Sequence, residues 1–116
     1  MSPPQNIILT IDIAHPPLRP EDAEMELERG LRTIESSENL RVLKIIHGYG
    51  SGGTGGTLKT LAQNWAFRKQ KRCRAIYDGA SLNPFSKDIQ KLMVECGLSV
   101  NEIGGNNEGI TMVWVK

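Results

Sequence analysis

The sequence predicts a single compact α/β domain, in which a mixed four- to five-stranded sheet is packed with helices in the order β-α-β-α-β-α-β. Three observations point to this fold class. The chain has 116 residues, the usual size of one domain. Its residues are 39% hydrophobic, enough for a core without disulfides or a structural metal. Short apolar runs also alternate with stretches of helical periodicity.

The first half of the chain is expected to give a leader, two strands and a helix. Residues 1–6 are expected to be flexible, and the β-branched run 7–13 predicts the first strand of a domain that continues to the end of the chain, 7–116. Apolar residues at helical spacing predict a helix over 20–36. Gly30 weakens that helix by roughly 1 kcal/mol relative to alanine, so a close packing contact is expected there. A second strand follows at 40–46, apolar on both faces as in a covered sheet.

The second half is expected to add two helices and two or three strands. A strand is predicted at 73–77, a short edge strand at 98–103, and a closing strand, alternating in pattern, at 109–115. The last helix is expected to begin after Ser86 as its N-cap and to stop at Gly97. The inward residues of the two helices and the last strand are Leu58, Leu61, Ala62 and Trp65, then Ile89, Leu92, Met93 and Cys96, with Trp114 from the strand.

Composition narrows the class of protein. The formal net charge is only +1, so any affinity for phosphate depends on where the charges lie. Cys73 and Cys96 are far apart, with no CxxC pair, which predicts two reduced thiols in an intracellular protein. No signal-peptide pattern and no apolar run of about 20 residues is present, so we expect a cytoplasmic protein without a membrane partner.

The segment from His47 to Thr57 is the most unusual in the chain, because it holds six of the twelve glycines between a strand and a helix. Glycines let a backbone approach a phosphate, and a helix N-terminus adds positive potential. The alternative is a flexible connection that binds nothing, but such a connection needs only a few residues. The segment lacks the lysine of a Walker loop. It fits G-x-G-x-x-G at Gly48, Gly50 and Gly53, but after the second strand and with no room for a substrate domain, which disfavours NAD.

Residues 47–52 (His-Gly-Tyr-Gly-Ser-Gly) resemble the H-G-x-G-x-G signature of the Smr (small MutS-related) family, at the end of a strand and ahead of a helix. The preceding run 42–46 looks like the family's second strand. Residues 11–13 (Ile-Asp-Ile) resemble its L-D-x-H motif, and 107–113 resemble its closing G-x-T-x-V strand. The resemblance covers about residues 7–116, and its middle motif is the specific one.

The resemblance implies a fold similar to the C-terminal domain of translation initiation factor three, and binding or endonucleolytic cleavage of DNA or RNA. It implies catalytic roles for Asp12 and His47. In the family the first-motif histidine comes two residues after the aspartate, where this chain has Ala14, and His15 is displaced by one residue. Such a shift turns an extended side chain to the other face, unless a bulge or turn at Ala14 restores it.

Phosphodiester hydrolysis needs a base, an acid and charge stabilisation, which Asp12, His15 and His47 with loop N–H groups could supply. If the first two strands are parallel neighbours, these side chains lie at one edge beside the glycine loop. In the alternative interpretation, neither histidine is catalytic: His15 is an exposed loop residue and His47 only shapes the turn. Asp12 stands outside any carboxylate cluster, so no metal ligands are predicted. The cofactor stays open, a divalent metal such as magnesium included.

Five cations within seven residues, 68–74, predict a phosphate-contacting patch at the end of the second helix. Cations also favour helix C-termini because they complement the dipole, so a capping role is the alternative. Tyr49 could stack on a base, which contributes roughly 1–3 kcal/mol. The candidate nucleic-acid-binding residues are Gly48, Tyr49, Gly50, Ser51, Gly52, Lys59, Arg68, Lys69, Lys71, Arg72 and Arg74.

The sequence thus predicts a nucleic-acid-binding Smr-type domain with endonuclease activity as an open question. The alternatives are a non-catalytic binding module and a small phosphate- or nucleotide-binding domain that uses the glycine loop. The choice between DNA and RNA, the metal dependence, the oligomeric state, and whether the chain is a whole protein or an excised domain stay open.

Overall fold

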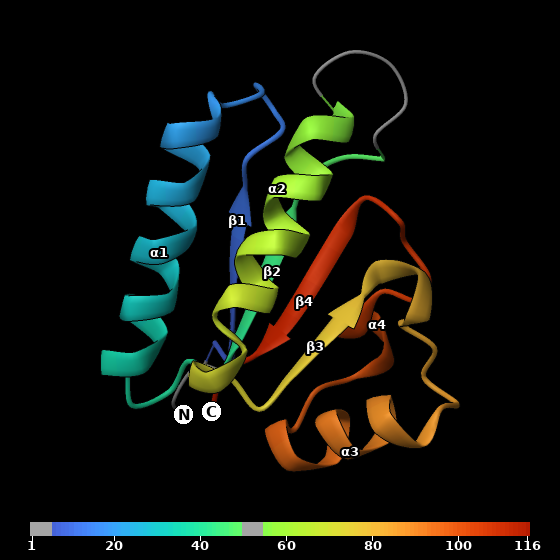
Figure 1. Ribbon diagram of the computed structural model, residues 1–116. Coiled ribbons are helices and arrows are strands. Elements are labelled where there is room, and N and C mark those ends of the chain that lie inside the picture. Colours follow the sequence, from blue (N-terminus) through green and yellow to red (C-terminus); the bar gives the residue numbers. More distant parts are fainter. Residues whose placement is uncertain (1–5, 50–54) are drawn as a thin grey trace.

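Four strands form one mixed sheet in the computed structural model, which describes residues 6–49 and 55–116. They are β1 (Ile8–Asp12), β2 (Val42–Ile46), β3 (Ala75–Asp78) and β4 (Ile110–Trp114), in the spatial order β1-β2-β4-β3 (Figure 1). β1 and β2 are parallel, and β4 is antiparallel to both of its neighbours. The expected mixed α/β sheet is therefore confirmed. The predicted leader lies outside the described residues, apart from Asn6.

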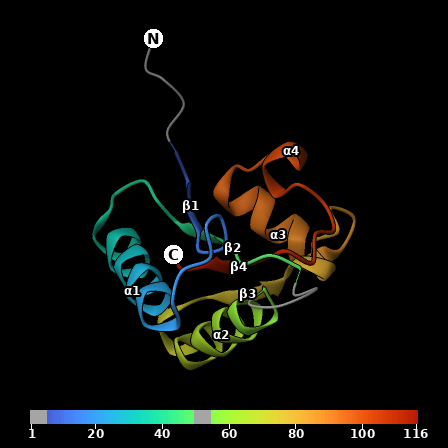
Figure 2. The ribbon, with the colours of Figure 1, turned by 90° about the horizontal axis from the view of Figure 1, so that it is seen from above.

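Helices cover both faces of this sheet, so the described residues form a compact domain of three layers (Figure 2). α1 and α2 pack on one face, and α3 and α4 on the other. No helix in the described ranges is long and apolar enough to cross a membrane. The helices are α1 (Pro20–Ser36), α2 (Gly55–Arg68), α3 (Lys87–Cys96) and α4 (Val100–Ile103), with 3₁₀ turns at Gln70–Arg72 and Gly79–Ser81.

The predicted close contact at Gly30 is confirmed on the α1 face of the sheet. Gly30 is buried, and a Cβ added there would overlap Cδ1 of Ile11 in β1. Leu43 Cδ1 of β2 would lie 3.3 Å from the same Cβ. The glycine therefore lets α1 settle directly onto the two parallel strands, which outweighs the helix propensity that it costs.

The third helix begins and ends as predicted. The Ser86 side chain accepts a hydrogen bond from the Ile89 N–H at 3.3 Å, and Gly97 takes the left-handed conformation with φ of +68°. The prediction of a short edge strand at 98–103 is wrong, because residues 100–103 form α4 and Ser99 caps it. Ser99 and Glu102 make a reciprocal capping box, which starts a helical turn instead of an extended one.

β4 also differs from its predicted alternating pattern. All five of its residues are buried. The strand lies between β2 and β3 and has helices over both faces, so neither set of side chains reaches water. Trp114, predicted to be core, is 3% exposed.

Candidate functional site

A tight turn after β1 brings His15 back onto Asp12. Ala14 and Pro17 form an isolated bridge, and the Leu18 N–H donates to the Ile13 carbonyl at 2.9 Å, which closes the turn. The Asp12 carboxylate accepts from the N–H groups of Ala14 (2.8 Å) and His15 (3.1 Å). His15 Nδ1 lies 2.9 Å from Asp12 Oδ2. The turn thus brings the His15 ring to the Asp12 carboxylate, three positions earlier in the sequence.

The charge state of the Asp12 carboxyl fixes the tautomer of its partner. Partial burial raises the pKa of Asp12, but the hydrogen bonds from Ala14 and His15 outweigh it, and the net effect lowers that pKa. An ionised carboxylate only accepts, so the hydrogen in this contact is carried by His15 Nδ1. The neutral ring then keeps its Nε2 lone pair on a side chain that is 69% exposed. A pair of this kind can accept a proton from a bound substrate or water.

His47 follows β2 and is fully buried. Its Nδ1–H donates to the Gly48 carbonyl at 2.8 Å, and the Thr111 hydroxyl donates to its Nε2 at 2.9 Å. Burial lowers the pKa of His47, and the positive charge of Lys59 acts in the same direction, so the ring is neutral near pH 7. Both ring nitrogens are occupied. This geometry favours the interpretation in which His47 shapes the turn over the one in which it transfers protons.

The two motifs lie at one edge of the sheet, as expected for parallel neighbours. Asp12 and Ile46 are register partners in β1 and β2. Gly48 has φ of +83°, and a Cβ there would lie 3.8 Å from that of Ala14. The Gly109 carbonyl, just before β4, accepts from the N–H groups of both His47 and Gly48 at 3.0 Å. The residue before β4 therefore holds His47 and Gly48 beside the Asp12 turn.

Only the ends of the glycine segment belong to the described part of the chain. The candidate residues Gly50, Ser51 and Gly52 lie outside it. Tyr49 is 65% exposed. A Cβ added to Gly109 would lie 3.4 Å from Cε2 of the Tyr49 ring. Its ring therefore rests on the backbone at one edge and is available to a ligand elsewhere.

The basic cluster 68–74 is largely neutralised by carboxylates of the neighbouring helices. Arg72 Nη2 lies 2.6 Å from Glu35 Oε1, and these contacts lower the pKa of Glu35 and raise that of Arg72. Lys71 has no ion pair within residues 6–49 and 55–116. The other pairs are Arg68 with Glu24, Lys69 with Glu28 (3.3 Å), Arg72 with Glu28 (3.0 Å), and Arg74 with Glu95 (3.4 Å). Arg74 also stacks 4.1 Å above the centre of the Trp114 ring.

The basic cluster begins at the C-terminal end of α2, whereas Gly55 starts the helix at its other end (Figure 1). A 14-residue helix is about 20 Å long. The candidate binding residues therefore form two regions. Only Gly48, Tyr49 and Lys59, among those that the structure describes, belong to the region of Asp12, His15 and His47.

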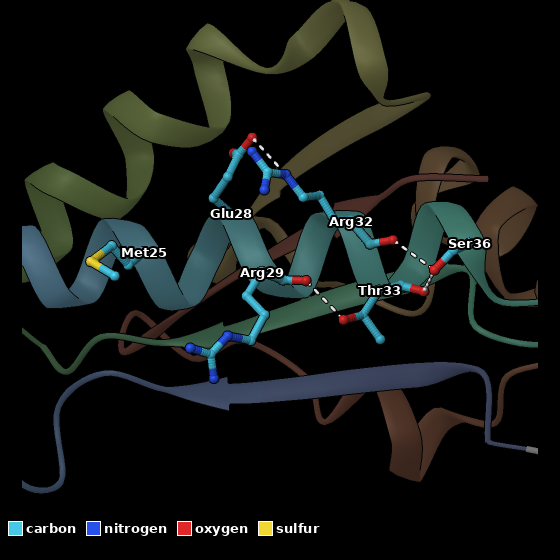
Figure 3. A pocket seen from close by; sticks show the side chains of 6 residues that line it. All are labelled: Met25, Glu28, Arg29, Arg32, Thr33 and Ser36. Atoms are coloured by element: carbon cyan, nitrogen blue, oxygen red, sulfur yellow. Dashed lines mark hydrogen bonds and ion pairs between the residues drawn. The ribbon is translucent and has the colours of Figure 1, made fainter.

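A hollow on the outer face of α1 offers no comparable chemistry (Figure 3). Its six lining residues all come from that one helix. The Thr33 hydroxyl donates to the helix's own Arg29 carbonyl at 2.8 Å, and Arg32 Nε lies 3.9 Å from Glu28. The hollow is therefore a gap between side chains of one helix. Its lining residues are Met25, Glu28, Arg29, Arg32, Thr33 and Ser36.

Two residues near the site were missed by sequence reasoning. Thr111 belongs to the run that resembles G-x-T-x-V but was not predicted as a site residue, and its contact with His47 spans 64 positions of sequence. Lys44 lies in a groove beside β1, and here a signal existed, because it is the one charged residue in the apolar run of β2. Within the described residues, no group of three or more His, Cys, Asp or Glu side chains could hold a metal ion.

Comparison with known proteins assigns no family: no family model, no curated protein and no solved structure matches the chain. The class of the protein is defined by its fold, a mixed α/β sheet between two helical layers. An exposed Asp-His pair at one edge of that sheet is the chemical feature on which a function can be argued.

Proposed function

We propose that this chain is a nucleic-acid-binding domain of the Smr type, in which His15, oriented by Asp12, transfers a proton during phosphodiester cleavage. The observation that carries the proposal is the Asp12–His15 pair, held at the carboxyl end of β1 beside Gly48. The sequence motifs at both positions support it. A relationship to the C-terminal domain of translation initiation factor three is part of the same proposal.

The division of labour follows from the hydrogen bonds. Asp12 keeps the His15 ring in one tautomer and stabilises the imidazolium that forms when Nε2 takes up a proton. The nucleophile that loses this proton attacks the phosphorus, the bond from phosphorus to the leaving oxygen breaks, and that oxygen takes up a proton from the His15 imidazolium or from water. Backbone N–H groups of a glycine-rich segment ahead of a helix are suited to the charge that develops on the phosphate oxygens. His47 contributes by fixing the backbone at Gly48.

A second candidate is a nucleic-acid-binding module without catalysis. The observation that favours it is the burial of His47, whose two ring nitrogens are both engaged. In this case the Asp12–His15 contact only closes the turn after β1, and Tyr49 is the main contact for a base.

Cleavage assays separate the two candidates. Purified protein is incubated with labelled structured RNA and with supercoiled DNA, in Mg²⁺ or EDTA, beside Asp12→Asn and His15→Gln. General base catalysis contributes about 10²–10⁴-fold, so we expect both variants to lose at least 100-fold in rate while binding persists. Because His15 is exposed, its replacement should not destabilise the fold enough to explain a loss of about 100-fold in cleavage rate. Equal cleavage by His15→Gln would overturn the catalytic assignment, and binding without cleavage by the wild type would establish the second candidate.

A further inference from the structure

A groove runs along β1 on the face of the sheet that carries α3 and α4. It reaches from the start of β1 to the first turn of α4. The two helices leave Thr10 and Asp12 of β1 exposed on this face, while Ile8 is half-buried. Side chains two positions apart on a strand share a face, so Thr10 in the groove precedes Asp12 on the same face of β1. Asp12 itself lies just beyond the groove, at the end of the strand, where it also borders a hollow beside α1. It is lined by Asn6, Ile8, Leu9, Thr10, Lys44, Asn101 and Glu102.

Lys44 is the cation of this groove. It is the register partner of Thr10 and is half-buried in β2, and within the described ranges it forms no ion pair. The carboxylate that shares the groove, Glu102, is already used in the capping box, where it accepts from the Ser99 N–H at 2.9 Å. A half-buried ammonium without a carboxylate partner is suited to an anion that arrives from outside.

The ion pairs of the basic cluster strengthen this assignment. Arg68, Lys69, Arg72 and Arg74 are bound to carboxylates, at the other end of α2 from the Asp12 turn. Phosphates close to that turn therefore need other cations. Lys44 lies on the neighbouring strand opposite Thr10. Thr10 is two residues before Asp12, which is about 7 Å along β1.

We propose that this groove binds the sugar-phosphate backbone of the nucleic-acid strand on which the Asp12–His15 pair acts, with Lys44 as a phosphate contact. Thr10, Asn6 and Asn101 offer hydroxyl and amide groups to the sugars and to further phosphate oxygens. The inference rests on the proposed function, and it gives the bound strand a path along β1 instead of across the basic cluster.

The test is fluorescence anisotropy with labelled 20-nucleotide single-stranded RNA and DNA over a range of salt concentrations. Lys44→Met keeps the aliphatic stem and removes the charge, and Lys44→Arg restores the charge. Lys71→Met tests the competing path over the basic cluster, because Lys71 is its exposed lysine without an ion pair in the described part of the chain. Thermal unfolding of each variant checks that the fold is kept.

For single strands, each neutralised phosphate contributes about 0.7 to the slope of log affinity against log salt. We therefore expect Lys44→Met to lower that slope by about 0.7 and to weaken binding about fivefold at 0.1 M salt. Lys44→Arg should bind like the wild type, and Lys71→Met should leave the slope unchanged.

Three other outcomes contradict the inference in different ways. If the wild type binds and Lys44→Met binds with the same slope, the groove is not the path of the strand, although the proposed function survives. If Lys71→Met alone lowers the slope, the strand lies on the basic cluster. If the wild type binds neither polymer, the proposed function fails together with this inference.

Discussion

The buried hydrogen bond between Thr111 and His47 gives the sharpest prediction about stability. Thr111 is 1% exposed and His47 is fully buried, so water cannot replace the hydroxyl that donates to Nε2. Thr111→Val removes the hydroxyl at nearly constant volume and leaves a buried acceptor unsatisfied. The cost of such a group is about 1–3 kcal/mol.

Thr111→Ser is the matched control, because it keeps the donor and removes one methyl group. That methyl group contributes roughly 0.8 kcal/mol if it is fully buried. We therefore expect the free energy of unfolding to fall in the order wild type, Thr111→Ser, Thr111→Val. With a central loss of about 2 kcal/mol, the valine variant should melt roughly 8 °C below the wild type.

The assay is urea unfolding at pH 7.5, followed by circular dichroism, with thermal melts as a second measure. The reasoning is refuted if Thr111→Val is as stable as the wild type, or more stable than Thr111→Ser. Either result would mean that the hydroxyl has no acceptor in the folded protein, and the structural role assigned to His47 would fall with it.

Three further predictions concern stability. The pKa of His47 lies below its usual value of 6.5, so the unfolded chain binds this proton more readily. The contribution of neutral His47 to the free energy of unfolding is therefore complete above pH 6.5. As the pH drops below 6.5, that free energy decreases by at most about 1.4 kcal/mol per pH unit. Urea unfolding at several pH values should show this decrease in the wild type and not in His47→Asn. Gly79→Ala would place its Cβ on the Asn107 carbonyl oxygen, so we expect urea unfolding to show a loss of about 3 kcal/mol or more. In Gly97→Ala the Cβ meets open space and only the left-handed backbone is strained, so the expected loss is about 1–2 kcal/mol. Equal losses in the two variants would contradict this prediction. Arg72→Met breaks exposed ion pairs to α1 and should cost at most about 1 kcal/mol, and a loss that does not shrink in 1 M salt would show that charge is not its cause.

The elements that sequence reasoning predicted well are those with local determinants. The third helix is bounded by a serine cap and a left-handed glycine, and both signals act within a few residues of the chain. The parallel pairing of β1 and β2 follows from the helix between them. The prediction of a strand at 98–103 was based on its apolar residues and is wrong. The capping box of Ser99 and Glu102 is an equally local signal, and it starts a helix there.

The candidate site was less predictable because its character depends on residues that are distant in sequence. The five cations at 68–74 predict a patch from their spacing, but four of them pair with carboxylates of α1 and α3 in the described part of the chain. The role of His47 is determined by Thr111 in the last strand. The return of His15 to Asp12 depends on how the turn after β1 closes, which residue spacing alone left open.

The central claim is that the exposed Asp12–His15 pair, and not the buried His47, meets the nucleic acid. The most direct measurement is NMR of the two histidine rings, resolved through the His15→Gln variant, as a 20-nucleotide RNA or DNA is added. We expect the His15 ring signals to shift with saturation of binding, and the His47 ring to keep its Nδ1–H tautomer unchanged. Saturable binding that moves the His47 ring and leaves His15 unaffected would contradict the account.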